Sequence, residues 1–227
     1  MKIRVLRNSH KGFTLIEMIG VLAVIAILAA VLIPKVFEAI NSSRVNNAAM
    51  SCQTMKTAII DHYAKYNTLL WDGGAATPAA ITLTAGAYNN YDKLLLGEQL
   101  VDKALATKIS DPTDVGTKGA AAVTGTRVDL LDMPAATITV GATVVVASES
   151  PTFDLDGTGG NDVTGSLCSI AVLPNVAIAD ARDLSARIDG DQLSNAPGVT
   201  TEDLVGRVKY ATADAGSTTV YVYLTHR

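Results

Sequence analysis

Four oxygen-bearing side chains lie close together in one short segment of the sequence. Residues 154–162 read DLDGTGGND, and the candidate ligands in this segment are Asp154, Asp156, Asn161 and Asp162. Carboxylate and amide oxygens on a glycine-rich loop are the hard ligands that Ca²⁺ prefers. The spacing is not that of an EF-hand, because Gly165 stands where the bidentate glutamate would be. The segment is therefore either a calcium site or a solvated acidic turn.

Residues that could support catalysis are scattered along the chain. The three histidines, His10, His62 and His226, are far apart and have no metal-ligand spacing. The sequence also lacks the nucleophile-elbow and Walker phosphate-loop motifs. We therefore expect a protein that is not an enzyme and that has no certain cofactor, with Ca²⁺ as the one candidate.

One carboxylate lies within a long apolar segment. Phe13 to Ile33 comprises 21 residues, and Glu17 is the only charged residue among them. As a helix, this segment would be about 31 Å long, enough to cross a hydrocarbon core of about 30 Å. A carboxylate near the middle of such a span costs about 2.5–3.5 kcal/mol. We expect a membrane-spanning helix in which Glu17 either meets a partner outside the span or reaches the lipid headgroups.

The residues before the span are basic. Four positive charges and no acid occur in the first twelve residues, at Lys2, Arg4, Arg7 and Lys11. This bias predicts a cytoplasmic amino terminus and export of the residues after the span. A secretory signal peptide would have a shorter apolar stretch, of about 7–15 residues. A cleavable signal and a plain uncleaved anchor are the alternatives to a more specific role.

The junction between the basic segment and the span carries that more specific pattern. Gly12-Phe13, followed by Thr14-Leu15-Ile16-Glu17, resembles the processing site of type IV pilins and type II secretion pseudopilins. The resemblance implies that a prepilin peptidase cleaves between Gly12 and Phe13 and methylates the new amine. It also implies that Glu17, the fifth mature residue, pairs with the Phe13 amine of a neighbouring subunit in a filament.

The resemblance further implies where the protein works and with what. The expected partners are other copies, other pilin-like subunits, prepilin peptidase and an inner-membrane assembly platform. The precursor would cross the bacterial inner membrane once, with its head in the periplasm, before entering a periplasmic or cell-surface filament. Some pseudopilins hold calcium in an aspartate-rich loop. The alternatives are an initiating minor subunit at a filament tip and a membrane-anchored periplasmic binding module or enzyme.

The spacing of apolar residues predicts that the helix continues beyond the span. Pro34 ends the hydrocarbon run, usually kinks a helix, and is expected to matter for assembly. Apolar residues then recur every three or four positions. We therefore divide the chain into a cleaved leader (1–12), a transmembrane and filament-core helix (13–34), an amphipathic continuation (35–70) and a globular head (71–227).

The head contains strand signals that predict an antiparallel sheet. We expect a short helix over 91–106, a hairpin over 137–147, a buried strand over 166–173, a short helix capped by Asp180 and closed by Gly190, and a terminal hairpin. The predicted fold is α+β and pilin-like, with a long N-terminal helical spine packed on this sheet.

Two cysteines fall on segments predicted to be buried. Cys52 lies on the apolar face of the spine helix and Cys168 lies in the buried strand. If both point into one core in an oxidising compartment, they form a disulfide, with two free buried thiols as the alternative.

The charge of the mature chain argues against one class of partner. Removal of the four basic leader residues leaves 14 basic and 22 acidic residues, a net charge of −8. We therefore expect no nucleic-acid binding through a broad basic surface.

Overall fold

The chain consists of two compact units, Met1–Ser42 and Ser43–Arg227. We call them the N-terminal unit and the C-terminal unit and describe each by itself. The computed structural model describes residues 12–72, 79–81, 87–119, 124–132, 139–140, 143–144, 153–158, 162–163, 166–194, 202–211 and 216–227. The leader residues before Gly12 lie outside the described residues.

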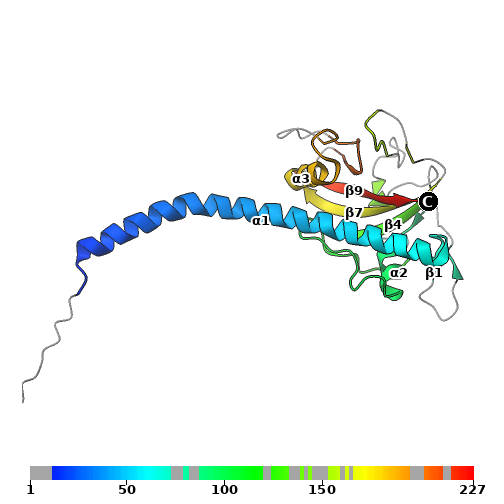
Figure 1. Ribbon diagram of the computed structural model, residues 1–227, viewed down its shortest axis with the longest axis horizontal. Helices are drawn as coiled ribbons and strands as arrows, with labels where there is room; N and C mark the ends of the chain where they lie inside the picture. The colour runs from blue at the N-terminus through cyan, green and yellow to red at the C-terminus, as the bar shows by residue number, and fades with distance from the viewer. Residues whose placement is uncertain are drawn as a thin grey trace, which may run out of the picture. The chain divides into compact units, whose positions relative to one another are not determined.

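Helix α1 (Leu15–Tyr66) is the longest element (Figure 1), and it continues through Pro34. Its C-terminal end is set by Asn67, whose φ of 57° is left-handed and whose N–H donates to the Tyr63 carbonyl oxygen at 2.7 Å. The predicted long helix that ends at about Tyr66 is confirmed.

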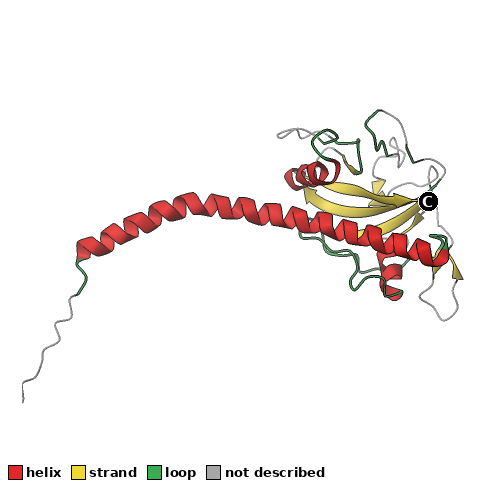
Figure 2. Cartoon of the chain, viewed as in Figure 1, coloured by secondary structure: helices red, strands yellow, loops and turns green. Residues whose placement is uncertain are grey.

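The C-terminal unit is built on a five-stranded antiparallel sheet (Figure 2). The strand order is β3 (Ala87–Tyr88), β4 (Arg127–Asp132), β7 (Leu167–Ala177), β9 (Ser217–His226) and β8 (Val208–Tyr210). Strand β7 is central and pairs with β4 on one side and β9 on the other. The predicted buried strand and the predicted terminal hairpin, which is β8–β9, are both confirmed.

The C-terminal part of α1 covers one face of this sheet. Its buried side chains recur at helical spacing and are Val45, Ala48, Cys52, Met55, Ala58, Ile59 and His62. They share a core with Ala171 and Leu173 of β7 and with Leu184 of α3 (Ile178–Asp189). A second cluster contains Phe153, Cys168, Ile170 and Tyr221. Side chains alternate along a strand, so the two clusters lie on opposite faces of β7.

The shorter elements match the predictions in part. Strands β1 (Trp71–Asp72) and β2 (Ala79–Ala80) pair with each other, and β5 (Thr139–Val140) pairs with β6 (Thr143–Val144) as the predicted hairpin. Helix α2 (Tyr91–Gly97) is shorter than predicted and ends at its glycine. Helix α3 is capped at Ala177 rather than at Asp180, which lies in the first turn, and Gly190 (φ 80°) closes it as predicted.

One buried carboxylate, Asp114, holds the loop between α2 and β4. Its Oδ1 accepts hydrogen bonds from Asn90 Nδ2 (2.9 Å) and the Gly116 N–H (2.6 Å), and its Oδ2 accepts them from the N–H groups of Thr124 (2.9 Å) and Gly125 (3.3 Å). Burial alone would raise the pKa of Asp114, but these four donors outweigh it and lower the pKa to about 2.

We predict that Asp114→Asn destabilises the protein at neutral pH and makes its stability less sensitive to acid. The folded-state pKa of Asp114 lies below its ordinary value of 3.8. The ionised carboxylate therefore stabilises the folded chain by about 2 kcal/mol above pH 4, and this contribution is lost as the pH falls from about 4 to 2. Thermal unfolding of the detergent-solubilised chain between pH 7 and 2 measures the effect. Asp191→Asn, which changes a carboxylate in an exposed turn, is the control. Identical dependence of stability on pH for wild type and Asp114→Asn would contradict the prediction.

Candidate functional site

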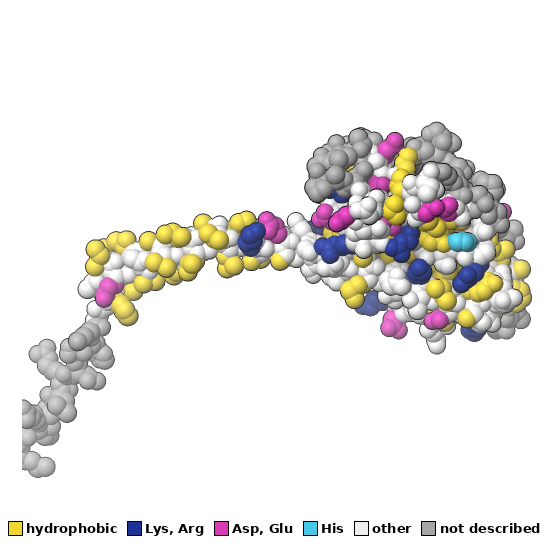
Figure 3. All heavy atoms as spheres, turned by 45° about the horizontal axis from the view of Figure 1, so that its top comes forward, with side chains coloured by type: hydrophobic (Ala, Val, Ile, Leu, Met, Phe, Trp, Pro, Cys, Tyr) yellow, Lys and Arg dark blue, Asp and Glu magenta, His cyan; other side chains and the backbone are white. Residues whose placement is uncertain are grey.

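The apolar half of α1 makes no buried contact within the described residues of the N-terminal unit. Its most apolar stretch of 18 residues has a mean hydropathy of 2.9, and none of it is buried. Phe13, at its start, is 81% exposed, and apolar side chains line the helix in Figure 3. By length and composition, α1 is the one described helix that could cross a membrane. Such a surface has to be covered by lipid or by other protein.

Glu17 takes part in the hydrogen bonds that begin this helix. The backbone N–H and the Oγ1 of Thr14 both donate to Glu17 Oε2 at 2.8 Å, and the Glu17 N–H donates to Thr14 Oγ1 at 3.3 Å. This is a capping box, in which two side chains satisfy backbone donors that the first turn leaves unpaired. This capping box was not predicted, although Thr14-Leu15-Ile16-Glu17 is the Thr-x-x-Glu signature.

The fold does not explain why residue 12 is glycine. A Cβ placed on Gly12 would meet no atom within 4 Å, and the backbone there is not left-handed. The same holds for Gly20 on the apolar helix, where the missing side chain leaves open space. The described structure therefore places no steric demand on this glycine. Cleavage at Gly12–Phe13 and assembly roles for Glu17 and Pro34 stay predictions.

Known proteins resemble this same end of the chain. The prokaryotic N-terminal methylation motif family matches residues 7–33. The type IV major pilin protein PilE of Neisseria gonorrhoeae is 32% identical over 79 residues, which cover 35% of this chain and 47% of PilE. PilE1 of the same organism is 34% identical over 75 residues, which cover 31% of this chain and 34% of PilE1. By this motif and these relatives, the N-terminal part of the chain is similar to that of type IV pilins.

The likeness to these pilins is partial. A fimbrial protein of Neisseria meningitidis serogroup A is 32% identical over 79 residues, which cover 35% of this chain and 46% of that protein. The chain thus spans no more than about half the length of the curated relatives named here. No solved structure matches the chain significantly.

The predicted disulfide is wrong. Cys52 and Cys168 are both free and buried. Cys52 lies in the core between α1 and the sheet, whereas Cys168 lies in the cluster on the opposite face of β7. The error has a physical cause, because a central strand is buried on both faces and its burial does not tell which face a side chain occupies. Burial raises the pKa of both thiols to about 12, so neither is reactive in the folded protein.

Three of the four candidate calcium ligands come together. Asp154, Asp156 and Asp162 each place one carboxylate oxygen within 4.8 Å of the others, and Asn161 lies outside the described residues. Backbone donors already reach this cluster, since the N–H groups of Leu155 and Asp156 donate to Asp162 Oδ2 at 2.6 and 3.2 Å. The donor set suits Ca²⁺, but these hydrogen bonds also stabilise an acidic turn without an ion, and calcium binding stays a prediction.

A buried hydrogen bond joins α1 to the residue that follows α2. His62 Nδ1 lies 2.9 Å from Glu98 Oε2, and neither side chain is exposed. The His62 ring packs against Tyr66 and Tyr91, with ring centroids 4.9 and 5.7 Å apart. The contact holds the C-terminal part of α1 against the end of α2. Because both side chains are buried, a substrate in solution cannot reach them. This contact was not predicted, and its one signal in the sequence is the position of His62 on the apolar face of the helix.

We predict that both cysteines of the native protein are free but protected. Alkylation of the folded chain at pH 8 should modify neither thiol on the timescale that labels an exposed cysteine. Unfolding in guanidinium without a reductant should then give two alkyl groups per chain by mass spectrometry. A reduced sample is the control and should give the same number. Two additional groups that appear only after reduction would show that the thiols are bridged.

Proposed function

We propose that this chain is a structural subunit of a bacterial filament, either a type IV pilus-like filament or a type II secretion pseudopilus. The observation that carries the proposal is the exposed apolar half of α1. A membrane covers this surface in the precursor, and helices of other copies cover it in the filament. Gly20, Ala23, Ala26 and Ala30 allow close approach between such helices.

Processing prepares the subunit for assembly in this proposal. A prepilin peptidase removes the basic leader at Gly12–Phe13 and methylates the Phe13 amine, and an inner-membrane platform then extracts the subunit. The open surroundings of Gly12 support this role, because the described residues leave room for a side chain there and do not themselves require a glycine. The C-terminal unit faces the periplasm before assembly, as the basic leader predicts.

Glu17 sets the register between subunits. Away from water, an unpaired carboxylate and an unpaired amine are each costly, whereas a close pair of the two offsets much of that cost. The Glu17 side chain of one subunit therefore selects the position at which the Phe13 amine of its neighbour lies beside it. The capping box of Thr14 and Glu17 supports this arrangement, since it holds the carboxylate at the helix start, four residues from the new terminus.

We predict that Gly12→Val leaves the leader attached. A Cβ at this position meets no atom of the described residues within 4 Å, so the variant should fold and insert normally. The peptidase should no longer accept the backbone at the cleavage site. Intact-mass measurement of protein purified from the membrane fraction distinguishes the two forms. A wild-type protein that retains Met1 in cells with an active prepilin peptidase would contradict processing at this site.

We predict that Glu17→Ala abolishes or shortens filaments without lowering the amount of subunit in the membrane. The span without the carboxylate is more apolar and should insert at least as well, whereas loss of one partner of a buried pair costs about 3–5 kcal/mol per contact. Glu17→Gln keeps the capping box but not the charge and should be milder. Filament number and length by electron microscopy, with membrane abundance, measure the effect.

Thr14→Ala is the matched control for Glu17. It removes the other half of the capping box and leaves the charge of Glu17 in place. We expect more filaments from Thr14→Ala than from Glu17→Ala. Normal filaments from a stably expressed Glu17→Ala protein would show that Glu17 does not set the register.

A further inference from the structure

Two buried carboxylates hold the start of α2 on the edge of β4. Strand β3 pairs with residues 130–131 of β4. At the residues of β4 before this pairing, groups from the start of α2 supply the hydrogen bonds instead. Asp92 Oδ1 accepts the Val128 N–H at 3.3 Å, and Asp129 Oδ1 accepts the Asn90 N–H at 3.1 Å. The contact between α2 and this part of the sheet therefore depends on two carboxylate side chains.

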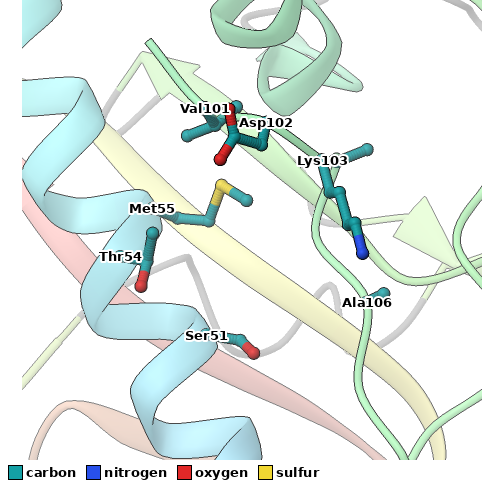
Figure 4. Close-up of a pocket in the computed structure, with 8 residues that line it drawn as sticks. Ser51, Thr54, Met55, Val101, Asp102, Lys103 and Ala106 are labelled. Carbon is teal, nitrogen blue, oxygen red and sulfur yellow. The ribbon is translucent and has the colours of Figure 1, made fainter.

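Asp92 also holds the segment that follows α2. Its Oδ2 accepts the Leu105 N–H at 3.0 Å. On its other side, this segment and α1 enclose a cavity of about 300 Å³ (Figure 4), which is lined by Val101 and Ala106 of the segment and by Met55 of α1, among others. Close packing is what usually holds protein segments in place. Because the cavity interrupts the packing on α1, the hydrogen bond to Asp92 matters more for the position of the segment.

The charges at this junction do not balance. Asp92 and Asp129 are 0% and 3% exposed. The buried Arg127 donates from Nε to Asp129 Oδ2 at 2.8 Å. Lys93 forms its ion pair with Asp114 at 3.9 Å and donates to two carbonyl oxygens of the same loop. Among the described residues, one cation therefore pairs with the two buried carboxylates.

The neighbouring strands add no positive charge to this junction. On β7, Ile170 lies beside Asp129 and Val172 lies beside Arg127, and both are apolar. On β9, Tyr221 lies beside Val172, and its buried hydroxyl group has no hydrogen-bond partner among the described residues. Burial raises the pKa of Tyr221, so its hydroxyl group is neutral at pH 7. The excess negative charge of the two carboxylates is thus not compensated from this side.

Burial without a balancing cation favours the protonated form of a carboxylate. Burial raises the pKa of Asp129 to about 6, although Arg127 acts in the opposite direction. Burial also raises the pKa of Asp92, and the N–H groups of Leu105 and Val128 offset only part of this effect. Because the charge of Asp92 acts on Asp129, the two carboxylates titrate as one coupled pair.

We propose that Asp92 and Asp129 together take up one proton as the pH falls from about 7 to 5, and that this proton stabilises the attachment of α2 to β4. Folding favours the protonated pair, so its contribution to stability is fully present below the ordinary pKa of 3.8 and is lost as the pH rises through about 6. Asp114 has the opposite dependence, because its folded-state pKa is lowered. The C-terminal unit should therefore be most stable at about pH 4–5. This property goes beyond the proposed function and does not depend on it.

Urea unfolding of the detergent-solubilised full chain at pH 7 and pH 5 tests the proposal, with the fluorescence of Trp71, the one tryptophan, as the signal. The folding equilibrium constant of the wild type should rise about tenfold from pH 7 to pH 5. In Asp92→Asn and in Asp129→Asn the rise should be less than about threefold, because Arg127 balances the carboxylate that remains. Asp132→Asn, which changes an exposed carboxylate on the same strand, is the control and should behave as the wild type does. An equal rise in the wild type and in both buried-site variants would overturn the proposal.

A measurement on the wild type alone serves if a variant does not fold. The ¹³C chemical shifts of the carboxyl groups of Asp92 and Asp129 report their protonation directly as the pH is changed. One member of the pair should have its midpoint near about pH 6, well above the value for an aspartate in water. Midpoints below about pH 4.5 for both carboxyl groups would show that the pair stays ionised and would overturn the proposal.

Discussion

The need to cover the apolar surface of residues 13–33 governs the rest of the molecule. Fourteen large apolar side chains between Phe13 and Ile33 are exposed. At about 1.5–3 kcal/mol for each side chain removed from water, their burial is worth on the order of 20 kcal/mol or more. This exceeds the cost of about 2.5–3.5 kcal/mol for one carboxylate in the span. The gain from burying these apolar side chains therefore outweighs the cost of Glu17, both in a membrane and in a bundle of helices.

The C-terminal part of α1 has a different residue pattern from the apolar span and packs on protein instead. From Val45 onward its apolar residues occupy one face, and that face packs on the sheet of the C-terminal unit. The buried pair of His62 and Glu98 adds a directional contact to this packing. Apolar packing alone tolerates small rotations of a helix, whereas a hydrogen bond closed to water does not, since a lost partner leaves a buried polar group unpaired. The contact therefore helps to fix which face of the C-terminal part of α1 packs on the sheet.

Features that depend on local sequence were predicted well, and features that depend on distant contacts were not. Helical spacing predicted α1 to its end at Tyr66, and alternation predicted the β5–β6 and β8–β9 hairpins. Helix α2 proved shorter because a local break at Gly97 outweighed the apolar pattern beyond it. The side of the sheet occupied by Cys168 and the donors gathered by Asp114 follow from pairing between distant segments. No window of the sequence contains that information.

A charge pair between Glu17 and the Phe13 amine of a neighbour would fix how far one subunit is displaced along the helix axis, but it would leave rotation about that axis almost free. The apolar side chains of residues 13–33 lie on all sides of the helix and are exposed all round, so they do not favour one rotation over another. Contacts outside the apolar span would therefore have to set the rotation of one subunit against the next.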